Sequence, residues 1–349
     1  MNFNERYMQE CIELAQQGLG NVAPNPMVGC VIVYEDRIIG RGYHKKYGEA
    51  HAEVNAIESV TDKSVLHKST LYVNLEPCSH QGKTPPCNEL IIQHRIPYIV
   101  IGCVDPNEMV KGKGIEKIVK AGSDVKLGIL EDACKDLNKR FFTYQEKKRP
   151  YIILKWAQTI DGFIDIKRNE ENIGKPTQIS NEASRKLLHK WRSEEQAIMV
   201  GTNTALMDNP KLTVREWQGK NPIRIVLDKW LRIPANYHLF DKSTPTIVFT
   251  NAEKYSEENL EYLKIDFEKN IPEQILQELY NKEIQSIIIE GGEQLLKAFI
   301  QNNLWDEARI FIANKKFGNG VCAPEFSGSI LEKENIAGDE LITYKNKNQ

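Results

Sequence analysis

Along the first 146 residues, segments with apolar residues at helical spacing alternate with short apolar runs typical of strands. The segment 4–17 carries apolar residues at helical spacing and therefore predicts an amphipathic helix. Short apolar runs bounded by turn residues predict strands at 28–34, 38–43, 70–75 and 98–102. Further helices are expected at 51–60, 86–94, 115–121 and 130–142.

The same alternation resumes after a basic, polar run at 145–150, which we interpret as a domain boundary. Strands are expected at 152–157, 197–201, 223–227, 246–249, 287–289 and 308–312, and helices at 181–193, 273–280 and 294–301. Helices that alternate with buried strands favour an α/β sandwich in each half. A length of 349 residues also favours two domains, which we place at 1–146 and 150–345.

Composition narrows the classes of function. The formal net charge is −2, which gives no electrostatic footprint for a nucleic acid or an anionic membrane. No stretch approaches the ~20 apolar residues of a membrane span, and the N-terminus lacks the apolar run of a signal peptide. We therefore expect a cytoplasmic protein. In that compartment, its seven irregularly spaced cysteines indicate a metal site more often than disulfides.

One set of residues has the order of a catalytic zinc site. His51 and Glu53 stand at the start of a predicted helix, Cys78 follows a predicted strand, and Cys87 opens the next helix. Catalytic zinc usually takes three protein ligands and keeps a fourth position for water, whose acidity it raises. His-x-Glu followed by Pro-Cys and a second Cys is typical of zinc deaminases, in which the glutamate transfers protons.

The spacing of these residues limits where they can lie. Two residues apart on a regular helix diverge by about 200°, so His51 and Glu53 can address one site only from the first turn. The eight residues between Cys78 and Cys87 must loop out and return. A structural zinc, or merely a capping histidine and buried thiols, are the alternatives, but a structural zinc would favour a fourth protein ligand and has no use for Glu53.

Several stretches of the chain resemble one family, the bifunctional riboflavin-biosynthesis deaminase–reductases. The matching segments are 24–33, 42–44, 51–53, 76–87, 105–107, 112–114, 155–162, 191–192, 200–215, 222–228 and 290–292. The resemblance implies a cytidine-deaminase-like α/β/α sandwich followed by a dihydrofolate-reductase-like α/β domain. It implies Zn²⁺ and NADPH as cofactors. It also implies a small phosphorylated pyrimidine as substrate, which is first deaminated and then reduced from a ribosyl to a ribityl compound. We further expect a homo-oligomer.

The same resemblance assigns roles to individual residues. In the first half, it places the pyrimidine at Asn25 and His44, and the phosphate or ribose at His80, Lys83 and Thr84. In the second half, the expected cofactor contacts are Ala157, Thr204, Asp208 and Gly292, and the expected substrate contacts are Arg192, Leu212, Arg215 and Glu290.

The residues of the second half support these roles in part. No Gly-x-Gly-x-x-Gly follows a strand, so a Rossmann site is not indicated. Segment 290–292 instead ends a strand with two glycines before a helix, and 200–204 is a second strand-to-loop candidate for a phosphate. Planar guanidinium groups at Arg192 and Arg215 suit a phosphate. The segment 163–178 departs from the family, with Gln178 in place of a common tryptophan.

Two other classes of protein share parts of this pattern. A nucleic-acid-editing deaminase would need a basic groove or a stacking platform, and the balanced charge and long cysteine insert argue against it. A metal-stabilised binding protein without turnover would release no ammonia from any substrate.

Overall fold

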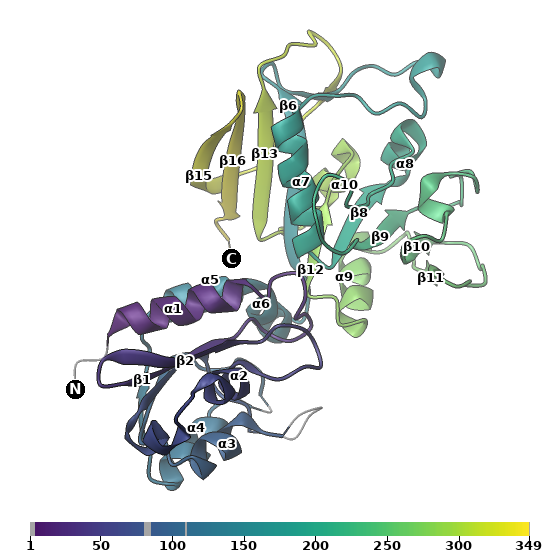
Figure 1. Cartoon of the computed structure of the whole chain (residues 1–349). Helices are drawn as coiled ribbons and strands as arrows, with labels where there is room; N and C mark the ends of the chain where they lie inside the picture. Colours follow the sequence, from purple (N-terminus) through teal and green to yellow (C-terminus); the bar gives the residue numbers. More distant parts are fainter. Residues whose placement is uncertain (1–3, 80–84, 109, 349) are drawn as a thin grey trace. The chain divides into compact units, whose positions relative to one another are not determined.

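A computed structural model describes residues 4–79, 85–108 and 110–348. The chain divides into two units, Met1–Lys148 and Arg149–Gln349 (Figure 1). Within the described ranges, no helix combines the length and the apolar character that a membrane crossing requires.

Helices and strands alternate in the N-terminal unit. The elements are α1 (Glu5–Gln16), β1 (Gly29–Tyr34), β2 (Arg37–Tyr43), α2 (Ala52–Ser59), η1 (Lys63–Lys68), β3 (Thr70–Leu75), α3 (Cys87–Gln93), β4 (Tyr98–Cys103), α4 (Lys113–Lys120), β5 (Asp124–Leu127), α5 (Glu131–Leu137) and α6 (Lys139–Lys147). The strands form one sheet in the order β2-β1-β3-β4-β5. β1 is antiparallel to both β2 and β3, and the remaining pairs are parallel.

Alternate residues of β1 supply two separate cores. Cys30 and Ile32 pack in a cluster that also contains residues of α2, α3 and α4. Val31 and Val33 pack on the opposite face, in a cluster with residues of α1, α5 and α6. Because successive strand residues point to opposite faces, this apolar run requires helices on both sides. The unit is the expected α/β/α sandwich.

The C-terminal unit is built on a longer sheet. The elements are β6 (Tyr151–Thr159), β7 (Phe163–Asp165), η2 (Glu170–Asn172), α7 (Glu182–Glu194), β8 (Ala197–Gly201), α8 (Thr202–Asp208), β9 (Ile223–Leu227), η3 (His238–Phe240), β10 (Thr246–Thr250), β11 (Leu260–Lys264), α9 (Ile271–Asn281), β12 (Ser286–Ile289), α10 (Glu293–Gln301), β13 (Glu307–Ala313), β14 (Val321–Cys322), β15 (Gly328–Ile336) and β16 (Asp339–Asn346). Nine strands pair in the order β11-β10-β9-β8-β12-β6-β13-β16-β15, and β7 pairs with β14.

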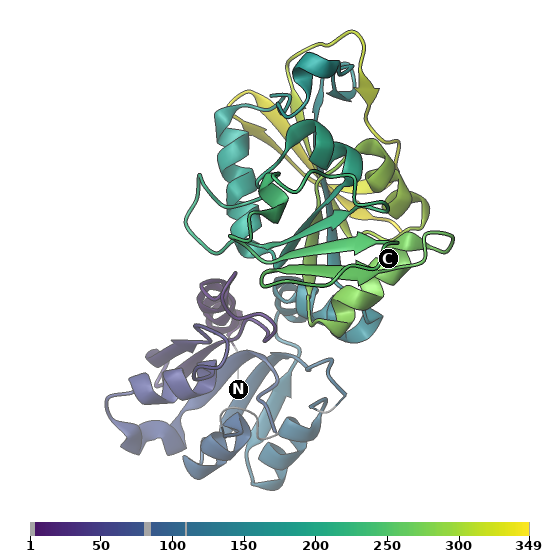
Figure 2. The ribbon, with the colours of Figure 1, turned by 90° about the vertical axis from the view of Figure 1, so that its right-hand side faces the viewer.

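Helices cover both faces of this sheet (Figure 2). One core contains residues of α9 and α10, and the other contains residues of α7 and α8. All pairs from β11 to β13 are parallel, whereas β16 and β15 add antiparallel strands at one edge. The predicted α/β class is therefore confirmed for this unit as well.

Two local predictions were wrong, and several strands were missed. The single helix expected at 130–142 is divided at Asn138, whose backbone leaves the helical conformation. Its side chain instead bonds both the backbone N–H and the carbonyl of Met27, at 2.8 and 2.9 Å. The loop expected after residue 201 is helix α8. The strands β5, β7, β11, β14, β15 and β16 were not predicted. β15 has a largely exposed surface, so it lacks the apolar alternation on which strand prediction depends.

Candidate active sites

Three elements bring the predicted metal ligands together. His51 is the N-cap of α2, Cys78 follows β3, and Cys87 is the first residue of α3. The Nδ1 atom of His51 lies 3.5 Å from Cys78 Sγ and 3.3 Å from Cys87 Sγ. Ligand atoms of all three lie within 4.8 Å of one another, which is close enough to hold one metal ion. As expected, Glu53 lies in the first turn of the helix that His51 opens.

The chemistry of this group fits a zinc ion. A hydrogen bond with the Cys87 thiol lowers the pKa of Cys78, which favours a thiolate at Cys78 of the kind that binds metals. The backbone N–H of Cys87 also donates to Cys78 Sγ at 3.3 Å. Glu53 is only 2% exposed, and its Oε2 atom has no hydrogen-bond partner among the described residues. Burial raises the pKa of Glu53 to about 6. A buried carboxylate beside three metal ligands is the arrangement that a zinc deaminase requires.

His44 and Asn25 lie next to this group. Nδ1 of His44 donates to the carbonyl of Ala50 at 3.1 Å, so Nε2 accepts the Asn25 amide, also at 3.1 Å. Burial lowers the pKa of His44, which keeps the ring neutral. The His44 and His51 rings meet edge to face, with centroids 5.2 Å apart. The two predicted pyrimidine residues therefore form a hydrogen-bonded pair at the edge of the metal group.

Glu76 organises the loop beside Cys78. Its carboxylate accepts backbone N–H groups of Gly112 at 2.9 Å, Gly114 at 3.1 Å and Asp105 at 3.3 Å. The start of α4 is thereby tied to the end of β3. Our sequence reasoning assigned no role to Glu76, and the acidic residue before Pro-Cys was the available signal. His80, Lys83 and Thr84 lie outside the described residues.

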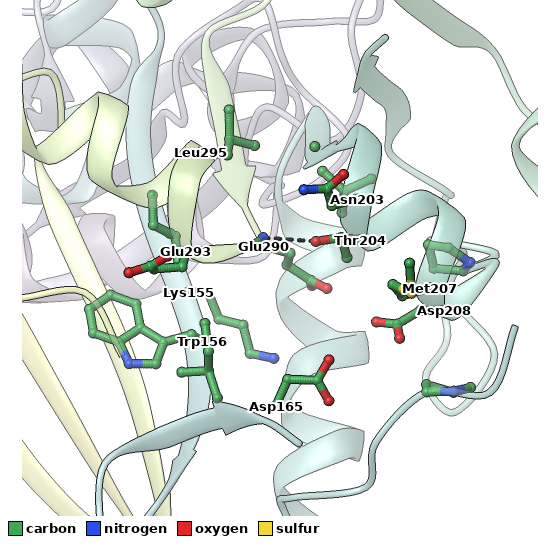
Figure 3. A pocket seen from close by; sticks show the side chains of 18 of the residues that line it. Lys155, Trp156, Asp165, Asn203, Thr204, Met207, Asp208, Glu290, Glu293 and Leu295 are labelled. Carbon is green, nitrogen blue, oxygen red and sulfur yellow. Dashed lines mark hydrogen bonds between the residues drawn. The ribbon is translucent and has the colours of Figure 1, made fainter. Parts of the chain in front are cut away.

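The C-terminal unit contains a cavity of about 1680 Å³ at the carboxyl ends of β6, β8 and β12. All eight residues predicted for the reductase line it. They are Ala157, Arg192, Thr204, Asp208, Leu212, Arg215, Glu290 and Gly292. Figure 3 shows Lys155 and Asp208 reaching this space from different elements.

The glycines after β12 close one side of the cavity. The backbone N–H of Gly292 donates to Thr204 Oγ1 at 2.9 Å, which joins the start of α10 to α8 (Figure 3). A Cβ atom at Gly292 would lie 2.9 Å from the same oxygen, and Gly291 has φ +137°. The conformation of Gly291 therefore favours glycine, and a side chain at Gly292 would displace the Thr204 hydroxyl.

Basic side chains also line the cavity. Arg192 pairs with Glu290 at 2.8 Å and also donates to the carbonyl of Thr213 at 3.3 Å. The backbone N–H of Arg215 donates to Nδ1 of the buried His189 at 3.0 Å. Burial also lowers the pKa of Lys155. Our sequence reasoning assigned no role to His189 or Lys155, although a lysine within an apolar strand was a visible signal.

Two family models match this chain in succession. Residues 1–103 match the cytidine and deoxycytidylate deaminase zinc-binding region, and residues 150–336 match the RibD C-terminal domain. The fold and the two sites thus define an enzyme that joins a zinc-dependent deaminase to a reductase of the NADPH-binding type. The chain belongs to the RibD family of riboflavin-biosynthesis proteins. The resemblance, the enzyme classes and the cofactor types expected from the sequence are confirmed.

Similarity to this family extends over nearly the whole chain. The riboflavin biosynthesis protein RibD of Aquifex aeolicus (strain VF5) is 38% identical over 360 residues, which cover 98% of this chain and 98% of the relative. RibD of Escherichia coli (strain K12) is 34% identical and covers 91% and 90%. A Thermotoga maritima structure is 37% identical, covers 98% of both chains and has a TM-score of 0.89. Its name describes a diaminohydroxyphosphoribosylaminopyrimidine deaminase and 5-amino-6-(5-phosphoribosylamino)uracil reductase.

Proposed function

We propose that domain 1–146 deaminates 2,5-diamino-6-ribosylamino-4(3H)-pyrimidinone 5′-phosphate. Domain 150–345 then reduces the ribosyl group with NADPH to give 5-amino-6-ribitylaminouracil 5′-phosphate. The observation that carries this proposal is the pairing of a His-Cys-Cys group beside buried Glu53 with a cavity lined by all eight reductase residues. The two activities named for the Thermotoga maritima relative support the order of the reactions.

In the deaminase domain, His51, Cys78 and Cys87 would hold the zinc ion. Zinc in such a site supplies Lewis-acid activation of water. Glu53 Oε2 takes a proton from the attacking water and delivers it to the leaving amino group, so that one water is consumed and one ammonia is released. The His44–Asn25 pair orients the pyrimidine ring. We also assign phosphate or ribose contacts to His80, Lys83 and Thr84.

In the reductase domain, the cofactor supplies the hydride, and the protein positions it against the sugar carbon. Ala157, Thr204, Asp208 and Gly292 form the cofactor side of the cavity. On the substrate side, Leu212 and Glu290 shape the pocket, and the guanidinium groups of Arg192 and Arg215 bind the 5′-phosphate.

We also propose a cytoplasmic location and a homo-oligomer. The balanced charge supports a protein that meets small diffusible substrates rather than a polyanionic surface. Analytical ultracentrifugation of the purified chain tests the oligomer, and cell fractionation tests the location. A monomer at micromolar concentration would contradict the first proposal.

Ammonia release from the diaminopyrimidine phosphate tests the deaminase assignment. Glu53→Gln should retain zinc but lower the rate at least about a hundredfold, because general acid–base catalysis contributes about that much or more. The matched control is Glu58→Gln, an exposed position on the same helix. Ammonia release from cytidine instead of the diaminopyrimidine would assign a different substrate.

The reductase assignment has its own test. NADPH oxidation should require the deaminated product, and a domain that does not bind NADPH would contradict the reductase assignment.

A further inference from the structure

The segment in which the chain departs from its family forms one wall of the reductase cavity. Arg168, Gly174, Thr177 and Gln178 all line the cavity. Apart from the short turn η2, residues 166–178 contain no helix or strand. The regular backbone hydrogen bonds of a helix or strand therefore do not fix this wall, and its position depends on specific polar contacts.

Those contacts converge on one guanidinium group. Arg168 donates through Nε to Asp165 at 2.8 Å and through Nη2 to Asp208 at 2.6 Å. Its Nη1 atom donates to the carbonyls of Asn172 at 3.0 Å and Lys175 at 2.5 Å. The Arg168 side chain is only 10% exposed. A planar group with five N–H donors can make all four contacts at once, which a lysine cannot.

Two more hydrogen bonds fasten the same segment at its far end. The Thr177 hydroxyl donates to Asp165 at 2.5 Å, and the backbone N–H of Gly174 donates to the carbonyl of Met207 at 2.7 Å. Asp165 ends β7, whereas Met207 and Asp208 belong to α8. Figure 3 shows Asp165 and Asp208 approaching the cavity from these different elements. The wall is therefore clasped to the helix that carries two of the proposed cofactor contacts.

We propose that Arg168 is a positioning residue for the nicotinamide cofactor. By bridging Asp165 and Asp208, it holds the wall 166–178 against α8 and orients the Asp208 carboxylate. We call these hydrogen bonds of Arg168 to Asp165 and Asp208 the clasp, and the affinity of the cavity for NADPH depends on it. The inference rests on the proposed binding of NADPH in this cavity.

The test measures the Kd of NADPH from nicotinamide fluorescence, with the full chain and without any pyrimidine. Arg168→Met removes the clasp together with the charge. Asp165→Asn weakens the clasp but leaves the guanidinium in the cavity, because Asn keeps a single acceptor oxygen and cannot accept from both Arg168 Nε and the Thr177 hydroxyl as the carboxylate does. We expect each variant to raise the Kd about tenfold, the usual scale for a lost charged hydrogen bond. The double variant should add little, since both changes remove one unit.

Two other roles for Arg168 give different results. If its charge contacts a cofactor phosphate directly, Asp165→Asn should bind NADPH as tightly as the wild type, whereas Arg168→Met should not. If the clasp is merely structural, both variants should lower the melting temperature and leave the Kd unchanged. Either result overturns the proposal. The matched control is Lys186→Met, whose side chain is 53% exposed on α7 and should change nothing.

Hydrogen exchange gives a local readout that does not depend on cofactor binding. The Gly174 amide should exchange faster in both clasp variants, because its bond to Met207 belongs to the same wall. Arg168→Lys provides a milder change should Arg168→Met fail to fold. If the wild type itself does not bind NADPH, the proposed function fails. If it binds and the variants bind equally well, only the role of Arg168 fails.

Discussion

Arg192 and Glu290 form a buried, two-point ion pair in the reductase cavity. Nη2 of Arg192 lies 2.8 Å from Oε2 of Glu290, and Nε lies 3.2 Å from Oε1. The two side chains are only 8% and 10% exposed. Burial tends to raise the pKa of Glu290, but Arg192 and Lys155 outweigh it, so the pKa lies below its usual value. Glu290 therefore stays ionised and fixes the direction of the guanidinium group that we assign to the substrate phosphate.

Removing one member of this pair should cost more stability than removing both. Arg192→Met leaves the charge of Glu290 buried, which typically costs about 3–5 kcal/mol. The double variant Arg192→Met with Glu290→Gln should recover part of that loss. The free energy of unfolding in urea measures both effects. Equal losses in the single and double variants would show that Lys155 alone compensates Glu290.

His189 should act through the nitrogen that accepts the backbone N–H of Arg215. The Asn oxygen in His189→Asn can take the place of Nδ1, whereas Gln places its amide near the position of Nε2. We expect His189→Asn to keep the KM for the pyrimidine close to that of the wild type. His189→Gln should raise it about fivefold, the scale of one lost hydrogen bond. The reverse order in steady-state assays would mean that Nε2 contacts the substrate.

The same histidine should make stability depend on pH. Burial, with help from Arg192 and Arg215, lowers the pKa of His189 to about 4, against 6.5 in an unfolded chain. As the pH falls from about 6.5 to 4, the unfolded state takes up a proton that the folded state does not. Stability should therefore decline over this window, with a slope of up to about 1.4 kcal/mol per pH unit from this group.

His189→Asn isolates that contribution. The difference in unfolding free energy between wild type and variant should shift in favour of the variant as the pH falls through the window, and it should level off below about pH 4. Chemical denaturation at several pH values measures the difference. A difference that does not vary with pH would contradict the assigned neutral state of His189.

Chelation of zinc should separate the two activities. His51, Cys78 and Cys87 all belong to the unit Met1–Lys148, whereas the described residues that line the reductase cavity all belong to Arg149–Gln349. Metal removal should abolish ammonia release and leave NADPH oxidation intact when deaminated product is supplied. Added zinc should restore the first activity. A parallel loss of both activities would mean that the reductase also depends on the metal.

Gly42 sets the distance between β2 and the helix that carries Glu53. A Cβ atom there would lie 2.2 Å from the backbone nitrogen of Ala56 and 2.4 Å from the carbonyl oxygen of Ala52. Gly42→Ala should therefore displace α2, cost about 3 kcal/mol and lower zinc content. Thermal unfolding and metal analysis measure these losses. Gly201→Ala is the stability control, since its Cβ would meet only Leu295 at 3.7 Å. Retained zinc in Gly42→Ala would show that α2 adapts.

Local sequence was sufficient where one element determines the outcome. Segments with a clear apolar period became the expected helices and strands. His51 and Glu53 could be placed together because two residues at that spacing can address one site only from the first turn of a helix. Prediction of secondary structure failed where a side-chain contact with a distant part of the chain interrupts the helix that the apolar pattern predicts. Asn138 divides a helix because its amide serves the backbone of Met27, 111 residues away. No helical pattern contains that information.

Taken alone, the sequence determined the two-part α/β organisation and predicted the zinc ligands with Glu53, and its resemblance to a known family predicted the residues around the reductase cavity. The organisation follows from short-range periodicity, the zinc ligands follow from the order of the His-x-Glu and cysteine motifs, and the reductase residues follow from the resemblance alone. Tertiary structure decided which of those groups restrain one another. Arg168 meets Asp208 across 40 residues, His189 meets Arg215 across 26, and Arg192 meets Glu290 across 98. Such partners come together through the packing of helices on the sheet, and this packing depends on the whole chain.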